Sequence, residues 1–333
     1  MMTQTERPVA AMLATAAATA GYAPSIHNTQ PWRWRVQPDR LELYAERDRQ
    51  LAATDPDGRL LMLSCGVALH HARLALAAEG LTAQLRRLPD PAEPDLLAVL
   101  VPTGRTTVTG EAMRLVQTME LRHTDRRPVG DERVPDGSLT AIGASVDRPV
   151  RFQVLTPDGV LDLAAAASRA GEVTAHDPHV SDELAYWTSR AAPEGTGLPM
   201  AVLPARPQRT TVPGRDFGTA GTLPIGPGHD RAAAYAVLYG DDDEPESWLR
   251  AGEALSAAWL TATELGVSVV PLSGAIEVTA TREALRGVLA GLGHPYLVLR
   301  LGIADPDHAG PPHTPRIPAA QVVDTSAVRP TTP

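Results

Sequence analysis

The chain of 333 residues contains no lysine, so its 30 Lys and Arg positions are all arginine. A P-loop and a pyridoxal Schiff base both need a lysine, and Walker-type NTPases and pyridoxal enzymes are therefore excluded. Cys65 is the only cysteine. It excludes an internal disulfide, gives no reason to expect an oxidising compartment, and is more typical of a small core residue than of a nucleophile. Any bound anion must be held by arginine, hydroxyl or backbone N–H groups.

The sequence signals of several other protein classes are also missing. HExxH, GxSxG, CxxC and a strand-following GxGxxG do not occur, which argues against zincins, α/β-hydrolases and a classical dinucleotide fold. The adjacent His70 and His71 point in different directions on a helix and have no evident third ligand, so we expect no metal site. The net charge of −9 argues against nucleic acid as a partner, because a phosphate backbone needs a basic face.

Long hydrophobic runs are absent as well. No segment approaches the roughly 18 continuous apolar residues of a membrane span, and the Ala/Thr-rich run 9–20 lacks the basic flank of a signal peptide. We therefore expect a cytoplasmic protein without a membrane partner. A hydrophobic content of 43% and a charged content of 21% are typical of a globular protein. The length allows two ordinary domains or one fused pair.

The most informative stretch is residues 23–36, APSIHNTQPWRWRV. A helix-like Ala-rich run ends at Pro24 and Ser25, and residues 32–36 alternate as a half-buried strand does. Asn28, in the polar loop between them, is the only asparagine of the chain. Its amide offers a donor and an acceptor together, which suits the edge of a flat heterocycle. A turn that caps the strand is the alternative interpretation.

The segment PSIHNTQPWRW resembles the PSxxNxQPW loop of the nitroreductase-like FMN proteins, and this variant of it is similar to the Acg-type branch found in actinobacteria. In that fold the loop comes from one half of a dimer and touches the flavin held mainly by the other half. The resemblance implies an α+β fold and a non-covalent FMN. The loop residues that it places at the flavin are Pro24, Ser25, Ile26, Asn28 and Gln30.

Hydrophobic periodicity and turn residues predict the elements of the first half. We expect helices at 7–21, 60–80 and 111–121, and strands near 31–36, 40–46, 82–88 and 95–101. Residues 104–110 read as a short Thr/Gly linker.

The second half repeats part of the first. Residues 63–81 (LSCGVALHHARLALAAEGL) align without a gap on residues 249–267 (LRAGEALSAAWLTATELGV), 186 positions later. Gly66 matches Gly252 and Gly80 matches Gly266. Each copy pairs a small residue near its start with apolar residues at helical spacing, as two closely packed helices need. Coincidence between two Ala- and Leu-rich helices is the alternative.

The offset of the repeat changes along the chain. Residues 151–155 most resemble the strand at 32–36, at an offset of 119, so the second half carries 67 extra residues before its central helix. Much of this excess should lie in residues 191–229, and such a long irregular segment is typical of a functional loop or lid. We expect a first half at 1–112, a second half at 113–325 with a lid insertion at about 190–235, and a tail at 326–333. With the resemblance, this implies two fused half-modules that form an intramolecular pseudo-dimer and act as a monomeric chain.

The resemblance also indicates the groups that hold the FMN phosphate. RHTDR at 122–126 resembles the family's R-x-S-x-(K/R) phosphate segment, and PPHTPRIP at 311–318 resembles its closing segment, in which an arginine returns to the same phosphate. A charged surface helix end and a disordered Pro-rich tail are the alternatives. The first half has no equivalent of 122–126, which favours a single flavin. The phosphate-site residues implied are Arg122, His123, Thr124, Arg126, Thr314 and Arg316.

Two further segments are candidates for contact with the flavin ring. In the family a strand-to-loop step runs past the ring, which here implies Pro271, Leu272, Ser273 and Gly274. Many relatives carry a carboxylate where Ser273 stands, so the orientation of a nicotinamide stays open. Arg190 is a candidate for the pyrimidine edge, where a positive group stabilises the reduced anion.

The function implied is an FMN-dependent oxidoreductase that passes hydride from NAD(P)H through flavin N5 to a nitroaromatic or quinone. No catalytic side chain is required, because the flavin carries the chemistry. The alternative is an FMN-sequestering or storage flavoprotein with little turnover, since a lid over the ring would deny nicotinamide its stacking position. A cofactor-free interaction protein that kept only the fold is a third possibility.

Overall fold

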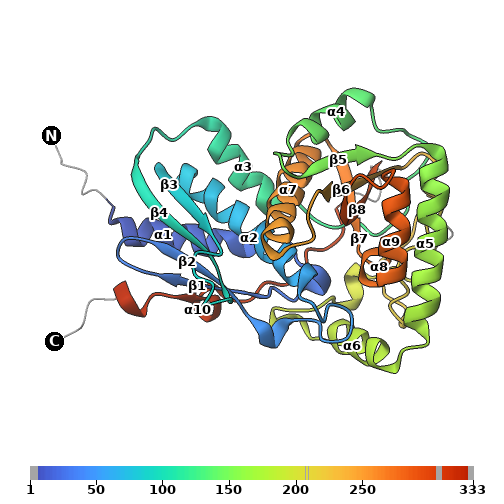
Figure 1. The fold of residues 1–333 in the computed structure, drawn as a ribbon, viewed down its shortest axis with the longest axis horizontal. Helices are drawn as coiled ribbons and strands as arrows, with labels where there is room; N and C mark the ends of the chain where they lie inside the picture. Colours follow the sequence, from blue (N-terminus) through green and yellow to red (C-terminus); the bar gives the residue numbers. More distant parts are fainter. Residues whose placement is uncertain (1–6, 207, 209, 305–309, 329–333) are drawn as a thin grey trace.

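Two β-sheets lie on either side of a pair of long helices in the computed structural model, which describes residues 7–206, 208, 210–304 and 310–328 (Figure 1). The helices are α1 (Val9–Thr19), α2 (Arg59–Ala78), α3 (Gly110–Leu121), α4 (Asp136–Ala144), α5 (Pro157–Ala175), α6 (Pro178–Thr188), α7 (Pro245–Glu264), α8 (Gly274–Glu277), α9 (Thr279–Val288) and α10 (Ala319–Val322). The strands are β1 (Trp32–Val36), β2 (Leu41–Ala45), β3 (Leu81–Arg87), β4 (Leu96–Arg105), β5 (Arg151–Val154), β6 (Ala234–Gly240), β7 (Val267–Leu272), β8 (His294–Ile303) and β9 (Val323–Asp324). The α+β class expected from the sequence is confirmed.

Helix α2 begins directly after a turn at residues 55–58. Gly58 has a left-handed φ of 73°, which glycine adopts without a Cβ penalty. The Asp55 carboxylate accepts hydrogen bonds from the Leu60 and Leu61 amides at 3.1 and 2.8 Å and so satisfies two free donors of the first turn. The linker expected at 104–110 is wrong in part, because β4 continues through Arg105 by pairing with β3.

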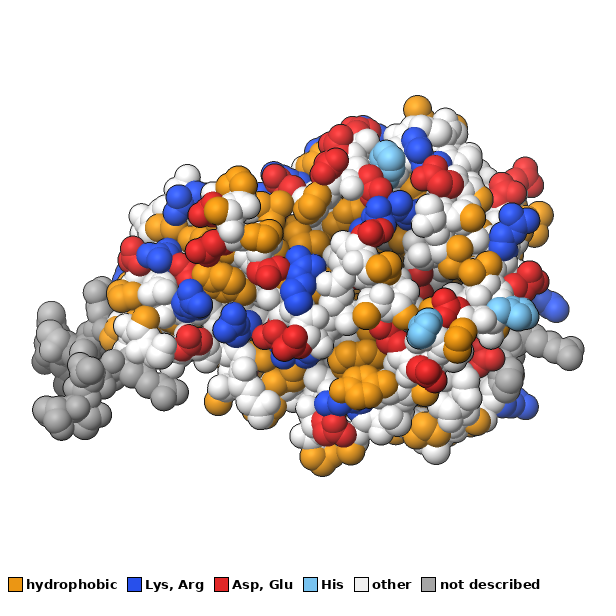
Figure 2. Space-filling view, turned by 60° about the horizontal axis from the view of Figure 1, so that its bottom comes forward, with side chains coloured by type: hydrophobic (Ala, Val, Ile, Leu, Met, Phe, Trp, Pro, Cys, Tyr) orange, Lys and Arg blue, Asp and Glu red, His pale blue; other side chains and the backbone are white. Residues whose placement is uncertain are grey.

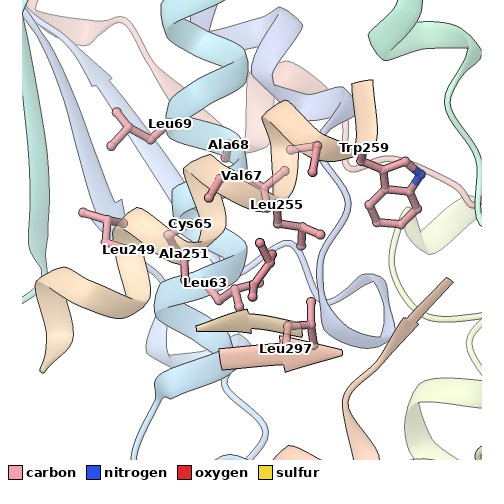
Figure 3. Close-up of a cluster of buried hydrophobic side chains, with 14 of the residues drawn as sticks. Leu63, Cys65, Val67, Ala68, Leu69, Leu249, Ala251, Leu255, Trp259 and Leu297 are labelled. Carbon is pink, nitrogen blue, oxygen red and sulfur yellow. The ribbon is translucent and has the colours of Figure 1, made fainter. Parts of the chain in front are cut away.

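The two copies of the repeated segment, α2 and α7, cross at their matched glycines. A Cβ on Gly66 would lie 2.0 Å from the Leu249 carbonyl oxygen, and a Cβ on Gly252 would lie 1.9 Å from the Leu63 carbonyl oxygen. Only glycine allows the two backbones to come this close. Apolar side chains of both helices fill the core around the crossing (Figure 3), and Cys65 is buried there as a core residue.

The two sheets have the same strand order. Starting from the strand that follows each long helix, the orders are β3-β4-β2-β1 and β7-β8-β6-β5, and all these neighbours are antiparallel. Strands β1 and β5, which the sequence comparison matched, occupy the same place in the two orders. The first sheet has one more strand, because β9 near the C-terminus adds to β1 in parallel.

The halves differ most between these equivalent strands. Four residues, 37–40, join β1 to β2, whereas residues 155–233 join β5 to β6. The excess is therefore not confined to 191–229: it begins with α5 and α6, which pack on each other, and α5 also packs on α8 and α9. The sequence predicts a helix end at 183–190, which agrees with the end of α6, whereas α5 was not predicted although its amphipathic pattern is present in the sequence.

Helix α2 is long and apolar enough to cross a membrane by length and composition. Here 78% of its most apolar window is buried inside the protein, against α1, α3 and α7, which is the environment of a core helix.

The face in Figure 2 mixes acidic and basic side chains without a continuous basic area.

Candidate cofactor site

Two cavities meet at the loop that precedes β1. The larger has a volume of about 1200 Å³ and extends along the ends of α2, α7 and β7, while the smaller lies between residues 122–126 and 312–316. Four residues line both: Pro24, Ser25, Thr124 and Arg126. The PSIHNTQPW loop and the RHTDR segment, about a hundred residues apart in sequence, are thus brought to one place.

Arg122 is the central residue of the smaller cavity. It is 4% exposed, its Nε and Nη1 have no hydrogen-bond partner among the described residues, and its guanidinium lies 4.5 Å above the Trp259 ring. Burial, followed by repulsion from Arg316, lowers the pKa of Arg122 to about 9. A buried cation with free donors and no counter-ion is costly, and an anion at this place would remove the cost.

Arg126 and Arg316 line the same cavity and are half-buried, with hydrogen bonds to protein groups. Burial lowers the pKa of each to about 10. In the described part of the chain no carboxylate forms an ion pair with either, because Asp125 instead binds Arg127 at 2.7 Å. Three arginines without a carboxylate partner among the described residues, Arg122 buried and Arg126 and Arg316 half-buried, therefore surround a small cavity. This is the donor set that a phosphate group requires.

Polar side chains complete the rim of this cavity. Thr314 Oγ1 lies 2.6 Å from the Arg316 Nη1 that donates to it. His123 and His313 pack edge to face with their ring centres 5.9 Å apart. The structure thus brings together all six residues expected at the phosphate: Arg122, His123, Thr124, Arg126, Thr314 and Arg316.

The amide of Asn28 binds protein groups. Its Nδ2 donates to the carbonyls of Gly197 at 3.1 Å and Pro315 at 2.9 Å, and its Oδ1 accepts from Arg316 Nη1 at 3.1 Å. In this structure Asn28 therefore positions Arg316. Gln30 acts similarly: its Nε2 donates to the Gly195 carbonyl at 2.6 Å and its Oε1 accepts from the Ile317 amide at 3.1 Å.

The loop holds an unfavourable backbone. His27, Asn28 and Gln30 have φ of 46°, 56° and 50°, in the left-handed region that non-glycine residues adopt at a cost of order 1–3 kcal/mol each. Two hydroxyls hold it in place: Ser25 Oγ accepts from the Gln30 amide at 2.8 Å, and Ser64 Oγ accepts from the Ile26 amide at 3.2 Å. A strained backbone that several hydrogen bonds hold in place is typical of functional sites.

The larger cavity contains the remaining expected flavin contacts except Gln30 and Arg190. Ile26 and the step at 271–274 line it, and Ser273 precedes α8. Arg190 lines neither cavity. It pairs with Glu194 at 2.7 Å, donates to Thr196 at 2.9 Å and stacks on Tyr186, so the structure does not place it at a ring edge.

Three residues of the site were not predicted. Trp259 lies under Arg122. The repeat could have drawn attention to it, because the two copies differ there: Arg73 stands at the equivalent position of the first copy. His27 belongs to the PSIHNTQPW loop and lines the larger cavity. Phe217 packs edge to face on His27, with 6.3 Å between ring centres, and it lies in the long insertion, where no periodicity marks it.

No protein-family model matches the chain, but curated proteins do. It is 39% identical to “Putative NAD(P)H nitroreductase Rv3131” of Mycobacterium tuberculosis, over 96% of this chain and 93% of that protein. It is 35% identical to “Putative NAD(P)H nitroreductase acg” of the same species, over 92% and 93%.

Solved nitroreductase structures are more distant. The FMN and NADPH-dependent nitroreductase NfnB from sphigopyxis sp. strain HMH is 18% identical with a TM-score of 0.41, over 63% of this chain and 97% of that one. A Bacteroides fragilis nitroreductase with bound FMN is 14% identical with a TM-score of 0.36, over 57% and 88%. Likenesses of this size carry no weight, and the assignment rests on the sequence relatives. With 35–39% identity to them over nearly its whole length, the chain belongs to the nitroreductase family, in the branch that includes Acg.

Proposed function

We propose that the chain binds one FMN, with the phosphate in the smaller cavity and the ring in the larger one, and that it works as an NAD(P)H-dependent oxidoreductase. The observation that carries the proposal is the group of arginines at 122, 126 and 316, one buried and two half-buried, whose charges no described carboxylate balances. A phosphate near charge −2 would satisfy both their charge and their free donors. The nitroreductase names of the relatives agree with this use.

We also propose that the chain is a fused pseudo-dimer. In a twofold-symmetric interface, equivalent residues touch one another only on the axis. The α2–α7 crossing has this property: Gly66 meets Gly252, and His70 Nδ1 lies 2.8 Å from Ser256 Oγ. Both pairs are 186 positions apart, the offset found in the sequence, and the shared strand order of the two sheets supports the same proposal.

The pseudo-symmetry supports one flavin per chain. The repeat places Arg87 where the other half has Ser273. The Arg87 guanidinium binds Glu253 through Nε at 2.6 Å and Nη2 at 3.0 Å, and Arg73 binds the same carboxylate at 2.7 Å. Glu253 is only 8% exposed. Side chains and a buried ion-pair network therefore fill the place where a second ring would lie.

When bound, FMN supplies hydride transfer at N5. Arg122, Arg126 and Arg316 would anchor its phosphate, and the loop at 24–26 and the step at 271–274 would fix the ring. His27 stays uncharged, because burial and then Arg215 and Arg126 lower its pKa well below the usual value. The residues would thus orient the cofactor and exclude water, and we propose a nitroaromatic or quinone as the acceptor of its electrons.

A segment of the insertion is a candidate lid over the ring. Arg215 forms an ion pair with Glu277 of α8, and both side chains are largely buried. Phe217 packs between His27 and Arg126, whose guanidinium lies 5.7 Å from its ring centre. These contacts favour the second candidate function, an FMN-storing protein with little turnover, if the segment stays closed in solution.

Titration of the purified protein with FMN tests the cofactor assignment. The visible absorbance band should report one FMN per chain. Each lost charge-assisted bond costs about 1.5–3 kcal/mol, so combining Arg122→Ala with Arg316→Ala should weaken FMN binding by about two to four orders of magnitude. Arg114→Ala is the matched control, because this exposed arginine pairs with Glu264 far from the cavity. Equal FMN affinity of the double variant and the control would refute the phosphate assignment.

Anaerobic addition of NADPH separates the two candidate functions. Rapid bleaching of the flavin band indicates the oxidoreductase. Flavin that dithionite reduces but NADPH does not indicates storage.

A further inference from the structure

The larger cavity continues away from the PSIHNTQPW loop into a side compartment, defined here by the residues of α5, α6, β6 and β8 that line it. Its total volume of about 1200 Å³ exceeds the roughly 300–1,000 Å³ that one drug-sized ligand occupies, even though the proposed phosphate cavity is separate. The first half has only the turn at 37–40 in the place of α5 and α6. The compartment is therefore a feature of the second half alone.

The walls of the side compartment are made of small and apolar side chains. Helix α5 contributes Leu163, Ala167, Ala170 and Thr174, which recur every three or four residues on one face. The eleven steps from residue 163 to residue 174, at a rise of 1.5 Å each, give this wall a length of about 16 Å. Helix α6 contributes Val180, Leu184 and Thr188 in the same way. The shape favours an elongated, mainly apolar ligand.

The cavity also reaches the surface along α5 and α6. Exposed residues of both helices line the cavity, among them Gly171 and Ala175 of α5 and Ala185 of α6. A ligand can therefore approach between α5 and α6 while Arg215 and Phe217 keep the candidate lid closed over the loop.

The floor carries two buried donors without acceptors. Tyr235 and Arg300 are direct cross-strand neighbours on β6 and β8, are 1% and 5% exposed, and line the cavity. The Tyr235 hydroxyl and Arg300 Nε have no hydrogen-bond partner among the described residues. Burial, aided by Asp230, raises the pKa of Tyr235 to about 12, against the opposing effects of Arg300 and the Val212 backbone. The phenol therefore keeps its proton, and it can donate.

The charge of Arg300 is already balanced. Its Nη1 binds the Asp230 carboxylate at 3.0 Å, and its Nη2 binds the carbonyls of Asp125 and Arg127, both at 2.8 Å. A ligand carboxylate would face Asp230 as a like charge, whereas a neutral carbonyl oxygen needs only the two free donors.

We propose that the side compartment is a second binding site, distinct from the flavin site, for a neutral, elongated apolar molecule whose carbonyl oxygen accepts hydrogen bonds from Tyr235 and Arg300. The ligand enters between α5 and α6. This proposal rests on the proposed function in one respect only: it places FMN at the other end of the same cavity.

Calorimetric titration of the flavin-loaded protein with 2-undecanone, undecane and undecanoate tests the site. The ketone should bind most tightly, the hydrocarbon more weakly for lack of an acceptor, and the carboxylate most weakly. Tyr235→Phe should weaken ketone binding about three- to tenfold and leave hydrocarbon binding unchanged. Ala167→Leu, which fills the wall, should weaken binding of both. Arg114→Ala is again the control.

Tighter binding of undecanoate than of the ketone would overturn the assignment of a neutral ligand. Absent ketone binding, or binding that neither Tyr235→Phe nor Ala167→Leu weakens, would overturn the site itself. The visible flavin band is recorded on the same samples. A protein that keeps the band but fails these tests refutes the second site and leaves the proposed function standing. A colourless protein that takes up no FMN refutes the proposed function.

Discussion

Replacing Gly252 by alanine should destabilise the protein strongly, because the new methyl group meets backbone. Its Cβ would lie 1.9 Å from the Leu63 carbonyl oxygen, whereas ordinary contact begins near 3.4 Å, so the two helices must separate by about 1.5 Å. Overpacking that side chains can relieve costs about 1–3 kcal/mol. Here the obstacle is main chain at the centre of the core, so we expect a loss of at least about 3 kcal/mol from a total stability of order 5–15 kcal/mol.

Urea unfolding followed by circular dichroism measures this loss. With a dependence of about 3 kcal/mol per molar urea, the midpoint should fall by about 1 M. Gly287→Ala is the matched control: Gly287 is an exposed residue of α9 with nothing within 4 Å of its added Cβ, and alanine there should be neutral or stabilising by about 0.5–1 kcal/mol. FMN affinity should fall only in the core variant, because Leu255 and Trp259 of the displaced α7 line the cavity. A Gly252→Ala protein as stable as the control would refute the close crossing.

The remaining predictions concern the PSIHNTQPW loop and the pH dependence of stability. Asn28→Ala should weaken FMN binding about ten- to hundredfold with an unchanged circular dichroism spectrum, because Arg316 loses its hydrogen-bonded support; parental affinity would make Asn28 a turn residue only. Burial lowers the pKa of His70 to about 4, so between pH 6.5 and 4 the unfolded chain binds a proton that the folded protein does not. The free energy of unfolding should therefore fall as the pH drops through this window, by at most about 3 kcal/mol from this group. Asp55, whose pKa burial raises to about 6, opposes this trend between pH 6 and 3.8. Urea midpoints at pH 7.5 and 5 should therefore differ less in His70→Gln than in the parent, and an equal difference would contradict the assignment.

The parts of the fold that were predictable carry strong local signals. Helix α2 was expected at 60–80 and is observed at Arg59–Ala78, because a long apolar run follows a turn that caps it. The matched glycines predicted a close pair of helices, and α2 and α7 do cross at them. The recognised loop and the RHTDR and PPHTPRIP segments were quoted from sequence, and the structure gathers them around one small cavity.

The parts that were missed depend on tertiary contacts. The irregular insertion has no period to read, so nothing in the sequence placed Phe217 on His27 or Arg215 on Glu277. Arg190 was a candidate for the pyrimidine edge of the flavin, but the neighbouring turn supplies it with Glu194 as a partner. The role of the unique Asn28 was visible only once the C-terminal segment, nearly 290 residues away, was seen to accept its hydrogen bond.

The contact between His70 and Ser256 has a consequence for how such a protein can evolve. Two identical chains related by a true dyad must set like against like at the centre of their interface, histidine on histidine or serine on serine. A single polypeptide escapes that restriction, and this chain places an imidazole nitrogen against a hydroxyl there, 2.8 Å apart. In the fused pair that we propose, the two halves are free to diverge at every axial position, so that one can bind a ligand while the other forms the wall of its site.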